Sequence, residues 1–242
     1  MKNSEYFDLA FNEAKKITPY LSGRLANSVL PNDDCSIHIS HDNSDAVRAL
    51  YEHLIETSKE AGHAYWLTRT WHLLCWQPIY LAFIFVYRVK AIPDITSISQ
   101  SIQPGFIAGF SFHNAELIFG LNEKIIPLIG TQLKRLFTSY REDISTWIRI
   151  RPGFTDHLVA DALLNCIIKL QTYQPALSNE YLLQQATLWL DAFELSNSHL
   201  SSLKVVHLTN RLKLVRTSCC LVYKCDGRKL CLDCPRHPDN KR

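Results

Sequence analysis

The sequence predicts an α+β protein that is mainly α-helical, with a small antiparallel β-hairpin or sheet and a cysteine-rich C-terminal segment. Three observations support this: helical hydrophobic periodicity over most of the chain, one stretch of period-two alternation, and five cysteines clustered near the C-terminus. The 242 residues are 47% hydrophobic and 20% charged, so the chain can bury a core without disulfides. Glycine is sparse, with eight residues, which argues against glycine-rich nucleotide-binding loops.

Three stretches in the first half have apolar residues at helical spacing. The expected helices span residues 6–16, from 44 to an end near Gly62, and 65–89, with a polar connection over 31–43. Pro78 should bend or divide the third helix. Its most apolar part, Leu73–Tyr87, has fifteen residues, whereas a membrane-spanning helix needs about 20. We therefore expect a buried core helix without a transmembrane segment; peripheral proximity to a membrane is the alternative.

The pattern then changes to alternation. Four apolar residues lie at every second position of 106–112, and Pro104-Gly105 suits the central positions of a type II turn. This predicts an antiparallel hairpin of residues 94–102 with 106–113, extended by 116–120. After Gly120 the helical period returns. The remaining helices are expected at residues 122–141, 155–172, 179–194 and 199–216.

The N-terminal residues mix acids and bases and contain no apolar signal-peptide core, so we expect a cytoplasmic protein. In that reducing compartment the eight cysteines are not expected to form a disulfide framework, and their clustering indicates metal or redox chemistry. Residues 203–242 carry ten Lys and Arg against three Asp, a charge of +7, whereas the rest of the chain carries −4. This basic end is expected to contact something anionic, such as nucleic acid or a negatively charged cofactor.

Five cysteines lie between residues 219 and 234: Cys219, Cys220, Cys225, Cys231 and Cys234. Their thiolates are soft metal ligands, and basic neighbours such as Arg216 and Arg236 favour the thiolate form. A structural zinc site usually pairs two Cys-x₂-Cys units, but only one is present, Cys231 to Cys234. The adjacent pair Cys219-Cys220 points in opposite directions in an extended backbone. The spacing therefore favours a two-iron cluster over zinc, without excluding zinc.

This segment resembles the C-terminal end of the FhuF-type ferric siderophore reductases. Two adjacent cysteines are followed by ten residues, a cysteine, two residues and a cysteine, with Arg216 before them, Tyr223 within and Pro235 after. The resemblance implies that Cys219, Cys220, Cys231 and Cys234 bind a [2Fe–2S] cluster. It further implies a mainly helical reductase body over residues 1–216 and a cluster-binding segment over 217–242.

The activity implied by the resemblance is that of an oxidoreductase, a cytoplasmic ferric-siderophore reductase. One electron passes through the cluster to Fe³⁺ in an imported siderophore, and the iron leaves as Fe²⁺. Such electron transfer requires no catalytic acid, base or nucleophile. The expected partners are a ferric siderophore as substrate and a separate electron donor, a ferredoxin-like protein or a flavoprotein reductase. No nucleic acid is expected.

Cys225 departs from the family pattern, because it lies inside the ten-residue spacer. It is expected to be a spare thiol, although it could replace Cys219 and give a spacing nearer to ordinary ferredoxins. Cys75 and Cys166 are expected to pack as small hydrophobic residues, and Cys35 to lie in a polar loop. The ten histidines are scattered and form no recognised ligand motif.

Two other functions remain open at this stage. The first is a zinc-stabilised nucleic-acid-binding module that uses the basic C-terminal region. The second is a [2Fe–2S] redox sensor in which oxidation at Cys225 changes a partner interface. A sensor should show neither preference for ferric chelates nor multiple turnover.

Overall fold

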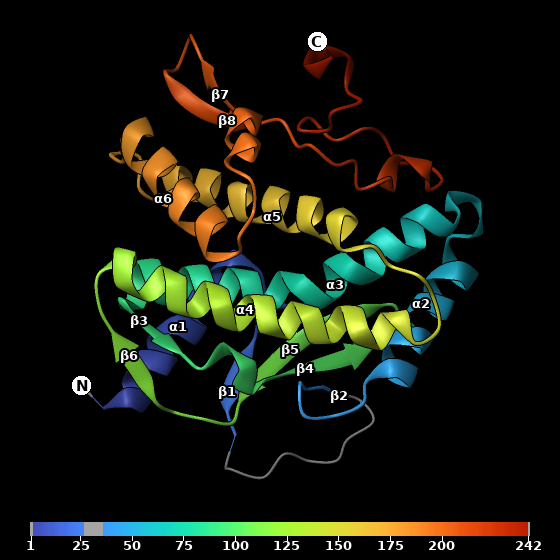
Figure 1. Ribbon diagram of the computed structural model, residues 1–242, viewed down its shortest axis with the longest axis horizontal. Helices are drawn as coiled ribbons and strands as arrows, with labels where there is room; N and C mark the ends of the chain where they lie inside the picture. Colours follow the sequence, from blue (N-terminus) through green and yellow to red (C-terminus); the bar gives the residue numbers. More distant parts are fainter. Residues whose placement is uncertain (1, 27–35, 242) are drawn as a thin grey trace. The chain divides into compact units, whose positions relative to one another are not determined.

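The computed structural model describes residues 2–26 and 36–241. The chain forms two compact units, one comprising residues 1–54 and 70–150 and the other comprising 55–69 and 151–242. Figure 1 shows the helices and strands of both units. Helices α2 (Ser44–Thr57) and α3 (His63–Ile84) each contribute residues to both units. Helix α2 confirms the helix predicted after Ser44, but it ends at Thr57 and not near Gly62 as predicted. A short 3-10 turn, η1 (Lys59–Ala61), precedes Gly62.

The first unit contains a four-stranded sheet with the order β1–β5–β4–β2. Its strands are β1 (Gly23–Leu25), β2 (Ser36–Ile37), β4 (Ile98–Gln103) and β5 (Phe106–Phe112). The antiparallel pair β4–β5 confirms the predicted hairpin, and Gly105 has φ +72°, as the turn requires. The predicted first strand begins later than expected, because Asp94 caps a 3-10 turn, η3 (Ile95–Ser97). Strand β1 pairs parallel with β5, so this sheet is mixed.

Three helices pack on one face of this sheet: α1 (Asn3–Ile17), α3 and α4 (Asn122–Ser145) (Figure 1). Phe7 of α1 packs edge-on against Phe112 of β5, with the ring centroids 5.4 Å apart, and both side chains are fully buried. The alternation seen in the sequence of β5 therefore reflects one face packed on helices. Helices α1 and α4 confirm two predicted elements.

Helix α3 continues through Pro78 and ends in a π-helical turn, η2 (Phe85–Val89), so Pro78 does not divide it. Proline has no N–H, which leaves the carbonyl of Leu74 without its intrahelical partner. The buried Gln100 of β4 supplies one: its Nε2 donates to the Leu74 carbonyl at 2.9 Å and to the Tyr140 hydroxyl of α4 at 2.8 Å. One amide thus links the strand to both helices where α3 lacks a hydrogen bond.

In the described part of the chain, one helical stretch, His63–Val89, is long and apolar enough to cross a membrane by length and composition. Of its most apolar window, 78% is buried inside the protein. Such burial is expected of a core helix.

Residues 116–120 do not extend the β4–β5 hairpin, so that prediction is wrong. The side chain of Asn114 accepts a hydrogen bond from the backbone N–H of Glu116 at 2.8 Å and turns the chain. Strand β6 (Leu117–Phe119) then pairs antiparallel with β3 (Ala91–Pro93) in a separate two-stranded sheet.

The second unit contains α5 (Pro152–Tyr173) and α6 (Asn179–Ala192), both predicted, followed by a 3-10 turn, η4 (Asn197–Ser202). The helix predicted over 199–216 is wrong: after η4 the chain forms an antiparallel hairpin of β7 (Leu203–Val206) with β8 (Arg211–Leu214). Leu208, which the helical pattern placed on a buried face, is 99% exposed in the turn. Asn210 adopts φ +48° there, which asparagine tolerates better than most residues. The mainly helical α+β class is confirmed.

Candidate metal centre

The segment after β8 has little regular structure, and backbone hydrogen bonds hold its path. The N–H of Arg216 donates to the carbonyl of Asp233 at 2.9 Å, and the N–H of Cys234 donates to the carbonyl of Cys231 at 3.0 Å. Leu221 adopts φ +60°, so the chain turns directly after the two adjacent cysteines. The residues before Cys219 therefore lie beside those between Cys231 and Cys234.

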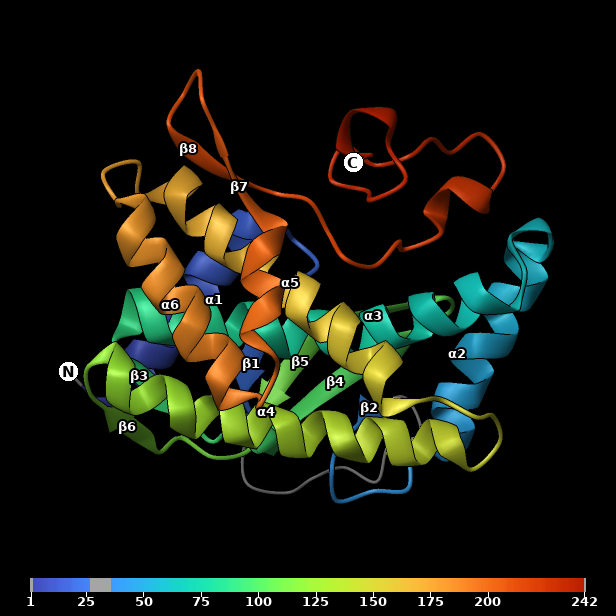
Figure 2. The ribbon, with the colours of Figure 1, turned by 45° about the horizontal axis from the view of Figure 1, so that its top comes forward.

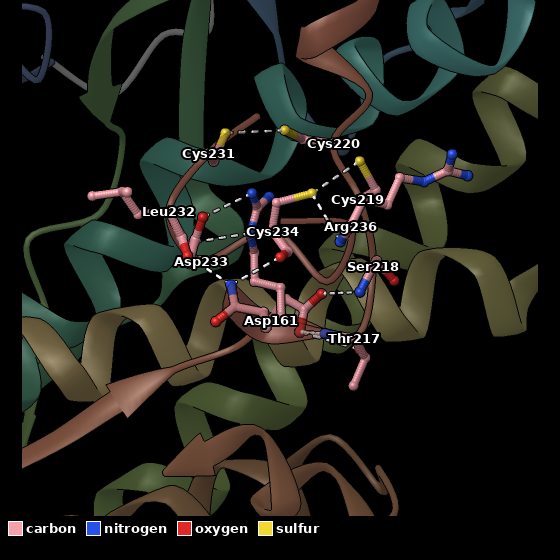
Figure 3. Close-up of polar contacts among 12 residues, drawn as sticks. Asp161, Thr217, Ser218, Cys219, Cys220, Cys231, Leu232, Asp233, Cys234 and Arg236 are labelled. Atoms are coloured by element: carbon pink, nitrogen blue, oxygen red, sulfur yellow. Dashed lines mark hydrogen bonds and ion pairs between the residues drawn. The ribbon is translucent and has the colours of Figure 1, made fainter. Parts of the chain in front are cut away.

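The four sulfurs of the predicted site form two close pairs (Figure 3). The Sγ atoms of Cys220 and Cys231 are 3.8 Å apart, and those of Cys219 and Cys234 are 3.5 Å apart. Two thiolates on one tetrahedral metal, with bonds of about 2.3 Å, are separated by about 3.8 Å. Each pair therefore has nearly the spacing of two ligands of one ion. The adjacent cysteines belong to different pairs, as expected from their opposite directions.

Two pairs suit two metal centres better than one. In the described ranges 2–26 and 36–241, no group of three or more His, Cys, Asp or Glu side chains is arranged to hold a single ion. A structural zinc ion needs four ligands around one point, whereas a [2Fe–2S] cluster takes two cysteines on each of two irons. The donor arrangement therefore fits the cluster and disfavours zinc.

Arg216 joins the two ends of the segment. Its Nη2 donates to Asp233 Oδ1 at 2.9 Å, and its Nε lies 2.9 Å from Asp233 Oδ2. The guanidinium also acts to lower the pKa of the Cys220 and Cys231 thiols. Although burial lowers the pKa of Arg216, the neighbouring Cys220 and the charge of Asp233 outweigh burial and raise it, so the residue stays cationic.

Asp161 of α5 anchors the same segment from the helix (Figure 3). Its two carboxylate oxygens accept hydrogen bonds from the backbone N–H groups of Thr217 at 2.8 Å and Ser218 at 2.7 Å. The side chain is buried, and burial raises its pKa while these N–H groups act in the opposite direction. Asp161 therefore fixes the two residues that directly precede Cys219.

The two sulfur pairs have different electrostatic surroundings. Burial acts to raise the pKa of Cys220, but the Val222 N–H and Arg216 outweigh it, and the pKa is lowered. Burial and the neighbouring Cys220 raise the pKa of Cys231. The other pair receives hydrogen bonds from uncharged groups: the backbone N–H of Leu221 donates to the sulfur of Cys219, and that of Arg236 to the sulfur of Cys234, each at 3.4 Å.

Cys225 is outside both sulfur pairs. It lies close to Tyr65, whose pKa is raised to about 12 by burial and by the neighbouring Cys225. Arg69 lies near Tyr65, Cys220 and Cys225, and burial lowers its pKa. Two residues from the start of α3 thus border the cysteine segment. The backbone N–H of Asp226 also donates to Glu60 Oε1 at 3.1 Å.

The remaining cysteines have no place in the centre. Cys75 and Cys166 are buried, and burial raises the pKa of both thiols, that of Cys166 to about 12. This confirms that they pack as core residues. Cys35 lies outside the described residues.

Three histidines predicted to be scattered do gather in the first unit. The rings of His41 and His113 lie 5.5 and 5.8 Å from that of His38. The pKa of His38 is lowered to about 4, mainly by burial and in addition by the neighbouring His113 and His41. Among the described residues the three rings do not form a group that could hold a metal ion.

Sequence reasoning missed Asp161, Tyr65 and Arg69, because they contact the cysteine segment from positions far away in the sequence. One signal could have pointed to Asp161: an acidic residue in an otherwise apolar helical stretch, residues 158–164. Buried carboxylates are rare unless they have partners.

A family model described as the FhuF 2Fe-2S C-terminal domain matches residues 216–236. The matched segment begins at Arg216 and includes all five clustered cysteines. No solved structure matches the chain. The family match confirms the resemblance predicted from the cysteine spacing, and it identifies residues 216–236 as similar to a domain that carries a [2Fe–2S] cluster.

Proposed function

We propose that this protein is a cytoplasmic ferric-siderophore reductase with its [2Fe–2S] site in residues 217–242 and a mainly helical body over 1–216. The observation that supports this best is the arrangement of four sulfurs in two pairs, at 3.8 and 3.5 Å, inside the segment that matches the FhuF domain. The protein takes one electron from a separate donor and delivers it to Fe³⁺ held by a siderophore.

Within this proposal Cys219 and Cys234 would hold one iron, and Cys220 and Cys231 would hold the other. When bound, the cluster supplies a one-electron redox centre. Arg216 offsets the negative charge of the thiolates, and its ion pair with Asp233 keeps the guanidinium in place. Cys234 is 1% exposed, which shields its sulfur from water, whereas Cys231 is partly exposed.

The substrate chemistry follows from ligand hardness. Hydroxamate and catecholate oxygens are hard donors that hold Fe³⁺ much more tightly than Fe²⁺. One added electron therefore weakens the chelate and lets Fe²⁺ leave. No bond in the siderophore needs to break, so no hydrolytic residues are required.

Anaerobic stopped-flow mixing tests the function. Dithionite-reduced protein, freed of excess dithionite, is mixed with a ferric hydroxamate complex in the presence of a chromogenic Fe²⁺ chelator. We expect one Fe²⁺ to be trapped for each cluster oxidised, and repeated turnover when a donor is added. Cys225→Ser, which lies outside both sulfur pairs, is the control and should react like the wild type.

Two results would contradict the proposal. A coloured protein whose oxidation shows no preference for ferric siderophores, and which does not turn over, would be a redox sensor. A colourless protein with one zinc per chain and salt-sensitive binding to DNA or RNA would be a zinc-stabilised nucleic-acid-binding module.

A further inference from the structure

Figure 2 shows hairpin β7–β8. The strand register places three cations on one face of this hairpin. Lys204 of β7 lies directly opposite Lys213 of β8, and Arg211 lies two residues from Lys213, hence on the same face. Arg211 and Lys213 are exposed, and Lys204 is half-buried. The opposite face carries three buried leucines, Leu203, Leu212 and Leu214. The cationic face is therefore the outer one.

The three cations have no counter-ion within residues 2–26 and 36–241, since no ion pair involves any of them. Like charges directly opposite each other on two strands destabilise the pair. A single acidic residue at either position would relieve the repulsion. The hairpin thus retains an unfavourable arrangement, which is consistent with an anionic surface binding there.

The hairpin is joined directly to the cysteine segment. The N–H of Val215 donates to the carbonyl of Ser202 at 2.8 Å, and that of the next residue, Arg216, donates to Asp233 at 2.9 Å. Four residues lie between Leu214 and Cys219, and the five residue-to-residue steps that join them span at most about 18 Å when extended. A partner on the hairpin is therefore held near the candidate metal centre.

We propose that the face formed by Lys204, Arg211 and Lys213 is the docking surface for the electron donor, and that this donor is a small acidic electron-transfer protein. The inference rests on the proposed function, which requires a separate donor. The reduced donor loses one electron and the protein gains one, and no bond forms or breaks. Redox complexes have small interfaces, and complementary charge accelerates their encounter.

A membrane or a nucleic acid fits this surface less well. Surface-bound membrane segments need a broad apolar face, but at this hairpin only Val205, 45% exposed, and Leu208 offer apolar contact. Strongly salt-dependent binding to DNA, with about six to ten phosphate contacts, needs more cations than the three on this face.

The test measures the donor step alone. Reduced plant-type [2Fe–2S] ferredoxin, a small acidic protein, is mixed anaerobically with the oxidised full-length protein at low and high salt. For the wild type the second-order rate constant should fall as salt increases. Lys213→Glu should lower the low-salt rate constant by about tenfold and weaken its salt dependence.

Lys213→Glu is not expected to destabilise the fold, because it places an acid opposite Lys204 and relieves the repulsion between the two lysines. A melting curve shows whether a slower rate comes from misfolding. The melting temperature should be equal to or above that of the wild type. The matched control is Lys124→Glu, the same charge change at an exposed lysine in the first turn of α4. Its rate constant should stay within about twofold of the wild type.

Equal rates for Lys213→Glu and the wild type, or equal slowing in both variants, would overturn the docking proposal. A second result would also overturn it. If Lys213→Glu no longer co-sediments with vesicles of phosphatidylglycerol and phosphatidylcholine, as the wild type does, but accepts electrons from ferredoxin at the wild-type rate, the face binds a membrane instead. Dithionite-reduced wild type that fails to reduce ferric siderophores contradicts the proposed function instead, because ferredoxin takes no part in that assay.

Discussion

Arg216 makes the two sulfur pairs unequal. Its positive charge acts on the thiols of Cys220 and Cys231, whereas the sulfurs of Cys219 and Cys234 accept hydrogen bonds from backbone N–H groups. Net charge and hydrogen bonds near the sulfurs help to set the reduction potential of iron–sulfur clusters. With a cluster bound, the charge of Arg216 would therefore stabilise the reduced cluster mainly through the pair Cys220 and Cys231.

Replacing Arg216 with Gln should lower the midpoint potential of the centre, because the charge beside Cys220 is lost. We expect about a tenfold shift in the ratio of reduced to oxidised protein, or about 59 mV, in an EPR-monitored redox titration. Arg216→Lys should shift the potential less. The control is Arg236→Gln. In the wild type the guanidinium of Arg236 donates a hydrogen bond to the Tyr223 hydroxyl at 3.1 Å, so the same change removes a charge that is bonded to tyrosine. Equal shifts in Arg216→Gln and Arg236→Gln would contradict the assigned role.

At the scale of elements, strand β4 and helix α3 depend on each other. Pro78 leaves the Leu74 carbonyl without a helical partner, and the amide of Gln100 replaces it. The same amide accepts a hydrogen bond from Gln77 Nε2 at 3.1 Å. The buried amide of Gln100 thus has hydrogen-bond partners for both its nitrogen and its oxygen.

Gln100→Leu should destabilise the protein by about 2–4 kcal/mol, because buried polar groups of α3 and α4 lose their partner. Chemical denaturation measures the change in the free energy of unfolding. The control is Gln103→Leu, the same substitution at an exposed position of the same strand, which should change stability by less than about 0.5 kcal/mol. A loss below about 1 kcal/mol for Gln100→Leu would show that these bonds contribute little.

Elements with strong local signals could be predicted. The β4–β5 hairpin combines alternation with Pro104-Gly105, and both features act within a few residues. The helix predicted over 199–216 was wrong although Val205, Leu208, Leu212 and Val215 recur at helical spacing. The deciding factor is the packing of Leu203, Leu212 and Leu214, which are buried on one face of a hairpin. The extension over 116–120 failed similarly, since pairing with β3 depends on a distant strand.

At the scale of the whole molecule, the part of the candidate metal centre that lies within one short sequence segment could be predicted. The cysteine spacing indicated the cluster-type segment, which the family match confirms. The sequence could not show that residues 55–69 join 151–242 in one compact unit, because no short-range pattern encodes that association. Tyr65 and Arg69, from 55–69, and Asp161 of α5 contact the cysteine segment because these stretches fold into the same unit. The functional division at residue 216 stays a prediction.

The ligand set is the prediction that concerns the whole protein, since the proposed activity depends on the cluster. Serine in place of any one of the four paired cysteines should bleach the protein, because an iron loses a thiolate ligand. Cys225→Ser should keep the colour. Bleaching in Cys225→Ser but not in Cys219→Ser would show that Cys225 is the ligand instead.

The most direct single measurement is the Mössbauer spectrum of ⁵⁷Fe-labelled protein purified without oxygen. We predict the diamagnetic signal of two coupled ferric ions in the oxidised protein, with two irons and two sulfides per chain. A protein without iron, or with a single uncoupled iron, would contradict a binuclear centre on Cys219, Cys220, Cys231 and Cys234.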